Sequence, residues 1–312
     1  MRRYLASALV FAVLALGSLD LAAQADVGSA PVSTDRVVLW ASTGDIKSRN
    51  LYYGPGGKEH FPKGPMKFLR EDSEGASPKF DVSDPSGEKW RAKLGIDSDL
   101  KVEDMPRHLR RGQNFVGPGG DVKNVRLQRH AAGGKKVGTW SWRHNPFYRT
   151  REFNGLRIMM ALISNWDLKD ENNAVYDDKI SPGHKFYEVS DLGASFGMNG
   201  KSYTDGLSKN NLKAYRHSKF ISKVTPEYVD FNFPTHPPFL YVFNFPFFFG
   251  QLHMHWIGKH IPRADARWLG SLLAQLSPEQ IRDAFRAANY SPPQVEAYAA
   301  AVQDRIAALE KL

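Results

Sequence analysis

The chain has 312 residues, contains no cysteine and carries a formal net charge of +9. Its length allows one large domain or two lobes that share a cleft, and the lack of cysteine excludes disulfides and thiolate metal sites. The charge favours acidic partners, among them phosphates, a membrane surface with anionic headgroups, and an anionic envelope polymer, without choosing among them.

The first 25 residues have the three parts of a secretory signal. Arg2 and Arg3 precede an apolar run at residues 5–19, and residues 23–25 have the small-x-small form that a signal peptidase reads. The apolar run has about 15 residues, whereas a membrane span needs about 20. We therefore predict cleavage near Ala25, a leader at residues 26–50, and a periplasmic or secreted protein.

Alternating apolar residues and dense turn formers predict a strand-rich segment at residues 51–146. Strands are expected at residues 66–70, 79–83, 89–94, 122–127 and 137–142. In the third of these strands apolar and charged residues alternate, which places Lys93 on the face nearer to water. The tetrad Gly-Pro-Gly-Gly occurs twice, at residues 54–57 and 117–120, and indicates turns.

The remaining residues, 147–312, are predicted to be mainly helical. Thr150 can cap a helix that runs to about residue 165, and a short strand at 187–190 ends just before Asp191. Ser277 and Ser291 each precede a proline and have a glutamine three residues later, as at the start of a helix. Strands followed by helices predict an α+β fold.

Two short motifs in the helical part carry the candidate chemistry. Residues 165–173 read NWDLKDENN, and residues 190–196 read SDLGASF. Phosphoryl transfer needs a carboxylate beside the accepting hydroxyl, with an amide oxygen and a second carboxylate on magnesium. Asp167, Asn172 and Asp191 supply these groups. From the sequence, Asp170 and Asn173 remain alternates for the first two roles, and such residues also simply cap helices and form turns.

The two motifs resemble those of a known superfamily. The run DLKDEN at residues 167–172 resembles the catalytic loop D-L-K-x-x-N of the protein-kinase-like superfamily, and DLG at residues 191–193 resembles its magnesium-binding D-F-G. Where the two motifs depart from these patterns, they are similar to those of atypical branches of the superfamily, such as phosphatidylinositol kinases, bacterial toxin kinases and secreted kinases. Longer phrases at residues 52–57, 151–155 and 256–262 also resemble a family of exported bacterial proteins. The resemblance implies a two-lobed kinase-like fold, with a strand-rich N-lobe and a helical C-lobe.

The resemblance also implies a role for each residue that matches a motif. Asp167 would orient or deprotonate the attacking hydroxyl, and Lys169 would offset charge on the transferred group. Asn172 and Asp191 would bind magnesium, and Lys93 would grip the phosphates of ATP. We therefore expect magnesium-dependent phosphoryl transfer from a nucleotide to a hydroxyl of an unidentified protein or small molecule, and no nucleic-acid partner.

Two alternative functions stay open at the sequence level. Residues 73–77, where a nucleotide loop is expected, contain one glycine, and Glu103 is the best candidate for an acidic partner of Lys93. The first alternative is therefore that the chain is an inactive pseudokinase that binds a ligand or partner. The second alternative is that the chain binds the cell-envelope surface through its basic charge and the aromatic run at residues 237–249.

Overall fold

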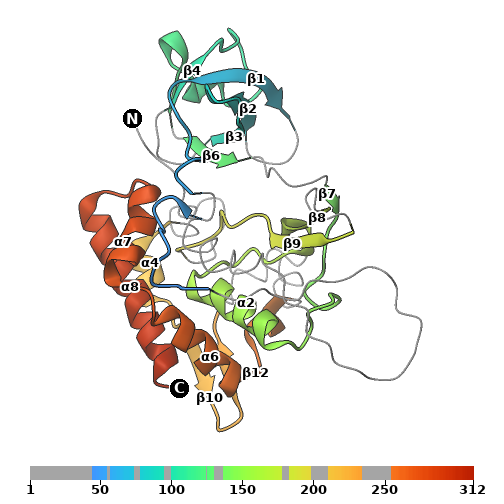
Figure 1. Cartoon of the computed structure of the whole chain (residues 1–312), viewed down its shortest axis with the longest axis vertical. Coiled ribbons are helices and arrows are strands. Elements are labelled where there is room, and N and C mark those ends of the chain that lie inside the picture. The colour runs from blue at the N-terminus through green and yellow to red at the C-terminus, as the bar shows by residue number, and fades with distance from the viewer. Residues whose placement is uncertain are drawn as a thin grey trace, which may run out of the picture. The chain divides into compact units, whose positions relative to one another are not determined.

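The computed structural model describes residues 44–54, 57–73, 78–94, 100–123, 125–129, 136–177, 183–197, 210–233 and 254–312. The fold is mixed α+β, as predicted (Figure 1). It divides into two compact units. The first unit consists of the described residues within Arg49–Ala132 and Glu279–Val295. The second consists of residues 44–48 and of the described residues within Gly133–Pro278 and Glu296–Leu312. The predicted boundary at residue 146 lies within the second unit, and the predicted signal lies outside the described residues.

The first unit is built on a six-stranded sheet. Its strands are β1 (Met66–Asp72), β2 (Lys79–Ser83), β3 (Lys89–Leu94), β4 (Leu100–Glu103), β5 (Asp121–Val122) and β6 (Val125–Arg129). The order is β5-β4-β1-β2-β3-β6, and only the β1/β4 pair is parallel. The strands predicted at residues 66–70, 79–83 and 89–94 are confirmed. The strand predicted at 122–127 is instead two short strands at opposite ends of this order.

The sheet of the first unit curls, because the short connection between its two outermost strands requires its edges to approach each other. β5 ends at Val122 and β6 begins at Val125, so these two ends can be no more than about 10 Å apart. Yet β5 and β6 are the two outermost strands, so the outer edges of the sheet must approach one another. Apolar side chains fill the inside of the curl: Met66, Phe80, Val82, Trp90, Ala92, Leu94, Val102, Val122, Val125 and Leu127.

Charged side chains form ion pairs across β1, β2 and β3. Arg91 Nη2 lies 3.0 Å from Asp72 Oδ2, and Arg91 Nε donates to Asp81 Oδ1 at 3.0 Å. Arg70 Nε also donates to Asp81, whose side chain is only 5% exposed. A nearly buried carboxylate is stable here because two guanidinium groups pair with it. Helix α7 (Pro278–Ala287) also belongs mainly to the first unit, and begins at the proline predicted to start it.

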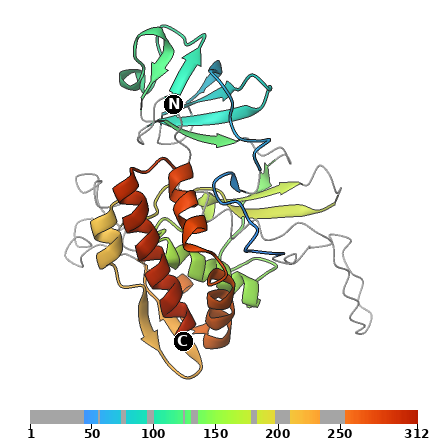
Figure 2. The ribbon, with the colours of Figure 1, turned by 60° about the vertical axis from the view of Figure 1, so that its left-hand side comes forward.

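The second unit contains two three-stranded sheets and most of the helices (Figure 2). One sheet joins β7 (Lys136–Gly138), β8 (Asn173–Asp177) and β9 (Lys185–Val189), and the other joins β10 (Ile221–Val224), β11 (Tyr228–Phe231) and β12 (Ile261–Pro262). The helices are α2 (Arg151–Leu162), α4 (Leu212–His217), α6 (Arg263–Leu273) and most of α8 (Pro292–Glu310). The strand predicted at residues 137–142 is shorter than expected, because the chain leaves the sheet after Gly138.

Local signals explain where these helices begin. Thr150 caps α2, since its Oγ1 accepts a hydrogen bond from Phe153 N at 3.2 Å. At the start of α8, Gln294 Oε1 accepts from Ser291 N at 3.0 Å, which is one half of a capping box. Both starts were predicted from the sequence. The aromatic run at 237–249 lies outside the described residues.

The buried side chain of Arg305 on α8 forms hydrogen bonds with the C-terminal end of α2. The side chain of Arg305 donates to Ala161 O, Leu162 O and Ser164 Oγ at 3.0, 2.7 and 3.0 Å. It also donates to Tyr215 O at 2.9 Å, and its guanidinium lies 3.9 Å from the Tyr215 ring centroid. Burial lowers the pKa of Arg305 below its ordinary value. The free carbonyl groups at a helix C-terminus carry a partial negative charge, which favours a cation at this position.

Candidate functional site

The two motifs meet at the open end of the β8–β9 hairpin in the second unit. β8 and β9 pair in antiparallel fashion, with Asn173 opposite Val189. This register brings Asn172, just before β8, next to the residues just after β9. The carbonyl oxygen of Asn172 accepts hydrogen bonds from Ser190 N at 2.7 Å, Ser190 Oγ at 2.9 Å and Asp191 N at 3.3 Å.

The side chain of Asn172 reaches the other motif. Its Nδ2 donates to Asp167 O at 2.8 Å and closes the turn that contains the short 3₁₀ helix Asp170–Asn172. Asn172 therefore binds the Asp167 segment with its side chain and the Asp191 segment with its main chain. Because Nδ2 is used in this way, Oδ1 is the amide atom that can ligate a cation.

The segments beside the two motifs run next to each other. Phe196 N donates to Ile163 O at 2.7 Å, and Trp166 N lies 3.5 Å from Ala194 O. Asp191 Oδ1 accepts from Gly193 N at 2.8 Å, which fixes the orientation of the carboxylate. The structure thus places Asp167, Asn172 and Asp191 in one hydrogen-bonded assembly within the second unit.

Asp167 carries an unsatisfied polar atom. Its Oδ1 is buried and accepts no hydrogen bond from any described residue, although Lys169 Nζ lies 3.4 Å away. The side chain as a whole is 28% exposed, so its other atoms reach solvent. The ammonium of Lys169 offsets part of the cost of burying this oxygen, and a hydrogen bond from a substrate hydroxyl or ligation of a metal cation would satisfy it further. Lys169 is 55% exposed and can approach a ligand from the solvent side.

The two alternate residues have other partners. Asp170 Oδ1 accepts from Trp142 N at 3.2 Å. Asn173 is fully buried, and its Nδ2 donates to Trp140 O at 3.0 Å. Both side chains thus hold the segment 140–142 against the motif. Asn173 Oδ1, like Asp167 Oδ1, is buried and takes no hydrogen bond from a described residue. Asn172 differs from Asn173 in that it bonds to both motifs.

Lys93 belongs to the first unit, on β3. It lies opposite Lys79 of β2 and Arg126 of β6 in the sheet register. Glu103 ends β4, a strand and not a helix, and β1 and β2 separate β4 from β3 in the sheet order. Glu103 is therefore not on a strand that neighbours Lys93. Most of the expected nucleotide loop, residues 74–77, lies outside the described residues.

The oxygen ligands at the motifs suit magnesium. Within the described ranges, no three histidine, aspartate or glutamate side chains gather closely enough to hold a metal by themselves. Magnesium is commonly held by one or two carboxylates, with substrate phosphates and water completing its shell. The carboxylate of Asp191 and the amide oxygen of Asn172 fit such a set, and the orphaned Oδ1 of Asp167 lies in the same assembly.

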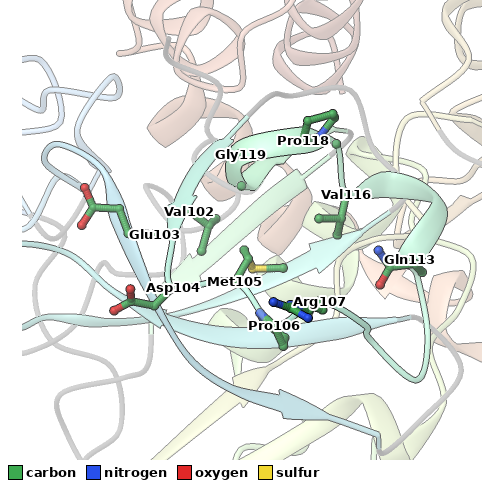
Figure 3. A pocket seen from close by; sticks show the side chains of 12 residues that line it. Val102, Glu103, Asp104, Met105, Pro106, Arg107, Gln113, Val116, Pro118 and Gly119 are labelled. Atoms are coloured by element: carbon green, nitrogen blue, oxygen red, sulfur yellow. The ribbon is translucent and has the colours of Figure 1, made fainter.

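A separate pocket of about 560 Å³ lies in the first unit (Figure 3). It lies between the residues that follow β4 and the turn at residues 117–120. Its lining residues are Val102, Glu103, Asp104, Met105, Pro106, Arg107, Gln113, Val116, Gly117, Pro118, Gly119 and Gly120. At Gly120 φ is +82°, and a Cβ there would lie 2.0 Å from Val102 O, so that only glycine fits. The sequence predicted this turn but not the pocket.

Three comparisons with known proteins, against family models, curated proteins and solved structures, found no match. In the part of the chain that the structure describes, no helix is both long enough and apolar enough to cross a membrane.

Proposed function

We propose that the chain is a protein-kinase-like phosphotransferase that moves a phosphoryl group from ATP to a hydroxyl acceptor with the help of magnesium. The observation that supports this best is the double role of Asn172, which bonds to Asp167 O at 2.8 Å and accepts from Asp191 N at 3.3 Å. This is the set of two carboxylates and one amide that phosphoryl transfer needs. The proposal includes a kinase-like fold, in which the first unit is the N-lobe and the second the C-lobe.

Each residue has a defined task in this proposal. Asp167 accepts or orients the hydroxyl proton, since its buried Oδ1 takes no hydrogen bond from a described residue. Lys169, 3.4 Å from that oxygen, offsets charge on the transferred group. Asn172 and Asp191 hold the magnesium ion, which when bound neutralises charge on the phosphates. Lys93 of β3 binds the phosphates of the nucleotide.

Binding of magnesium and ATP tests the proposal without knowledge of the acceptor. We expect the protein to gain about 2.7 kcal/mol of stability at a ligand concentration 100-fold above Kd. For a domain of this size that is a rise in Tm of about 5–10 °C. Asp191→Asn should remove most of this rise, because it removes the carboxylate charge that attracts the cation. The measurement is a thermal melt with and without magnesium and ATP.

The matched control is Asp177→Asn. Asp177 ends β8 in the same hairpin, is exposed, and forms no ion pair with a described residue. This variant loses the same charge but should keep the full rise in Tm. A rise that is absent from the wild-type protein, or equal in the wild type and in Asp191→Asn, contradicts the proposal.

A further inference from the structure

A short segment of the second unit presents three arginines on aromatic rings. The guanidinium carbon of Arg143 lies 4.7 Å from the ring centroid of Trp256, and that of Arg149 lies 5.6 Å from that of Tyr148. Arg151 lies 4.4 Å from the ring centroid of Trp268. We call these residues the arginine–aromatic surface: Arg143, Tyr148, Arg149, Arg151, Trp256 and Trp268.

Two of the three guanidinium groups have no carboxylate partner among the described residues. Arg151 Nη2 pairs with Glu152 Oε1 at 3.2 Å. Arg143 and Arg149 are exposed and have no carboxylate partner within the described ranges, and the exposed His144 lies beside Arg143 in the chain. Stacking on a ring orders a guanidinium while its N–H groups stay available for a planar, bidentate anion. Both arginines are therefore prepared to bind an oxyanion.

The backbone under this surface is firmly held. Arg149 has φ +70°, an uncommon conformation for a residue with a side chain, which costs about 1–2 kcal/mol. The turn that imposes it is closed by Thr150 N and Thr150 Oγ1, which donate to Phe147 O at 2.9 and 2.7 Å. A strained residue that its surroundings hold in place is common at binding sites.

Trp256 is anchored from within the unit. The buried side chain of Arg157 donates to Trp256 O at 3.2 Å and to Lys259 O at 2.7 Å. Its guanidinium also lies 5.3 Å from the Trp256 ring centroid. Burial lowers the pKa of Arg157 to about 10, so it stays charged at neutral pH. Arg143 therefore stacks on a ring whose position is fixed.

We propose that the arginine–aromatic surface binds a flexible phosphate polymer, of which inorganic polyphosphate is the simplest. Guanidinium groups bind phosphate oxygens in bidentate fashion. The ring centroids of Tyr148 and Trp256 lie 6.3 Å apart, so Arg149 and Arg143, which contact these two rings, belong to the same patch. Such neighbours suit a polymer that carries a charge on every repeat. The chain's net charge of +9 favours the same partner.

The rings argue against bases and lipid as the main contact. Trp256 and Trp268 are only partly exposed and each already lies against a guanidinium. Tyr148 is 44% exposed and is also in contact with Arg149. Stacking of nucleobases needs open ring faces, and insertion into a membrane interface needs projecting aromatic side chains. The available binding groups are instead the cationic N–H donors.

The test is binding of labelled long-chain polyphosphate to the purified full chain, followed by fluorescence anisotropy over a range of salt. The double variant Arg143→Gln/Arg149→Gln should weaken binding about tenfold or more. The slope of log Kd against log salt should fall by about 1.4, at 0.7 per lost phosphate contact. The matched control is Arg216→Gln/Arg267→Gln, which removes two exposed charges of the same unit that stack on no described ring. It should change Kd less than twofold.

Three other anionic probes test whether a phosphate polymer is the preferred ligand. Polyglutamate of equal charge, single-stranded DNA and anionic vesicles should each bind more weakly than polyphosphate, and less dependently on Arg143 and Arg149. Arg143→Lys should keep only part of the affinity that Arg143→Gln loses, because the lysine ammonium cannot form the bidentate pair of hydrogen bonds that a guanidinium forms. The proposal is overturned if the two double variants lose affinity for polyphosphate equally or if Arg143→Lys binds as tightly as the wild type. Stronger binding to any of the other three probes also overturns it. Since binding is measured without ATP, the result is independent of phosphotransferase activity.

Discussion

Replacing Asn172 with alanine is expected to lower the rate of phosphoryl transfer by at least about 10²-fold, the scale seen when one preorganised polar group is lost from an active site. The variant removes the hydrogen bond to Asp167 O at 2.8 Å and, with it, the amide oxygen that we propose for magnesium. The contacts of its main-chain carbonyl with Ser190 and Asp191 remain, so the hairpin should still form. The readout is the initial rate of ADP formation with saturating magnesium and ATP.

Asn172→Asp separates the two functions. Aspartate keeps an oxygen for the cation but cannot donate to Asp167 O, so the variant should still bind magnesium and ATP while transfer is slowed. Glu171→Gln is the control, because Glu171 is the exposed neighbour and its side chain forms no hydrogen bond or ion pair with a described residue. A normal rate in Asn172→Ala, or an equal loss of rate in Glu171→Gln, would show that Asn172 does not organise the site.

Replacing Arg305 with methionine is expected to reduce the free energy of unfolding by about 3 kcal/mol or more. Methionine fills much of the space but donates nothing to the buried oxygens of Ala161, Leu162, Ser164 and Tyr215 that Arg305 now satisfies. Buried acceptors without donors account for most of the cost. Urea unfolding followed by circular dichroism measures the change.

Arg267→Met is the matched control for Arg305→Met. Arg267 is exposed on α6 in the same unit, so its replacement should change stability by less than about 0.5 kcal/mol. If the two variants unfold alike, the hydrogen bonds of Arg305 contribute little to stability. Because Arg305 bonds to Ser164, close to Asp167 in the chain, its replacement should also lower activity in the folded fraction.

Local patterns were sufficient to find β1, β2 and β3 of the first unit, but not β4 and not the arrangement of the sheet. Alternation of apolar and charged residues in β3 marks a half-buried strand whatever its neighbours are. The separation of β5 from β6 depends on closure of the curled sheet, which no local pattern records. The prediction of one strand at 122–127 was wrong for that reason: apolar Val122, Val125 and Leu127 mark buried positions, but nothing local shows that Val122 and Val125 belong to different strands.

The candidate site was predictable because its parts are close in sequence. The β8–β9 hairpin between Asn172 and Asp191 brings its own ends together, so the two motifs meet although they are 19 residues apart. The buried arginines were not predicted, because arginine is most often exposed and the partners of Arg305 are carbonyl oxygens distant in the sequence. The stacking of Arg143 on Trp256 was missed for the same reason.

Transfer of the terminal phosphoryl group of ATP is the most direct measurement of the central claim. The purified protein, incubated with magnesium and γ-labelled ATP, should move label to itself, to an added acceptor or to water. Asp167→Asn should lower this rate about 10²–10⁴-fold, the usual contribution of a general base, and should keep the rise in Tm with magnesium and ATP. Binding without any transfer by the wild type would show an inactive pseudokinase. Transfer that is unchanged in Asp167→Asn would contradict the role given to this carboxylate.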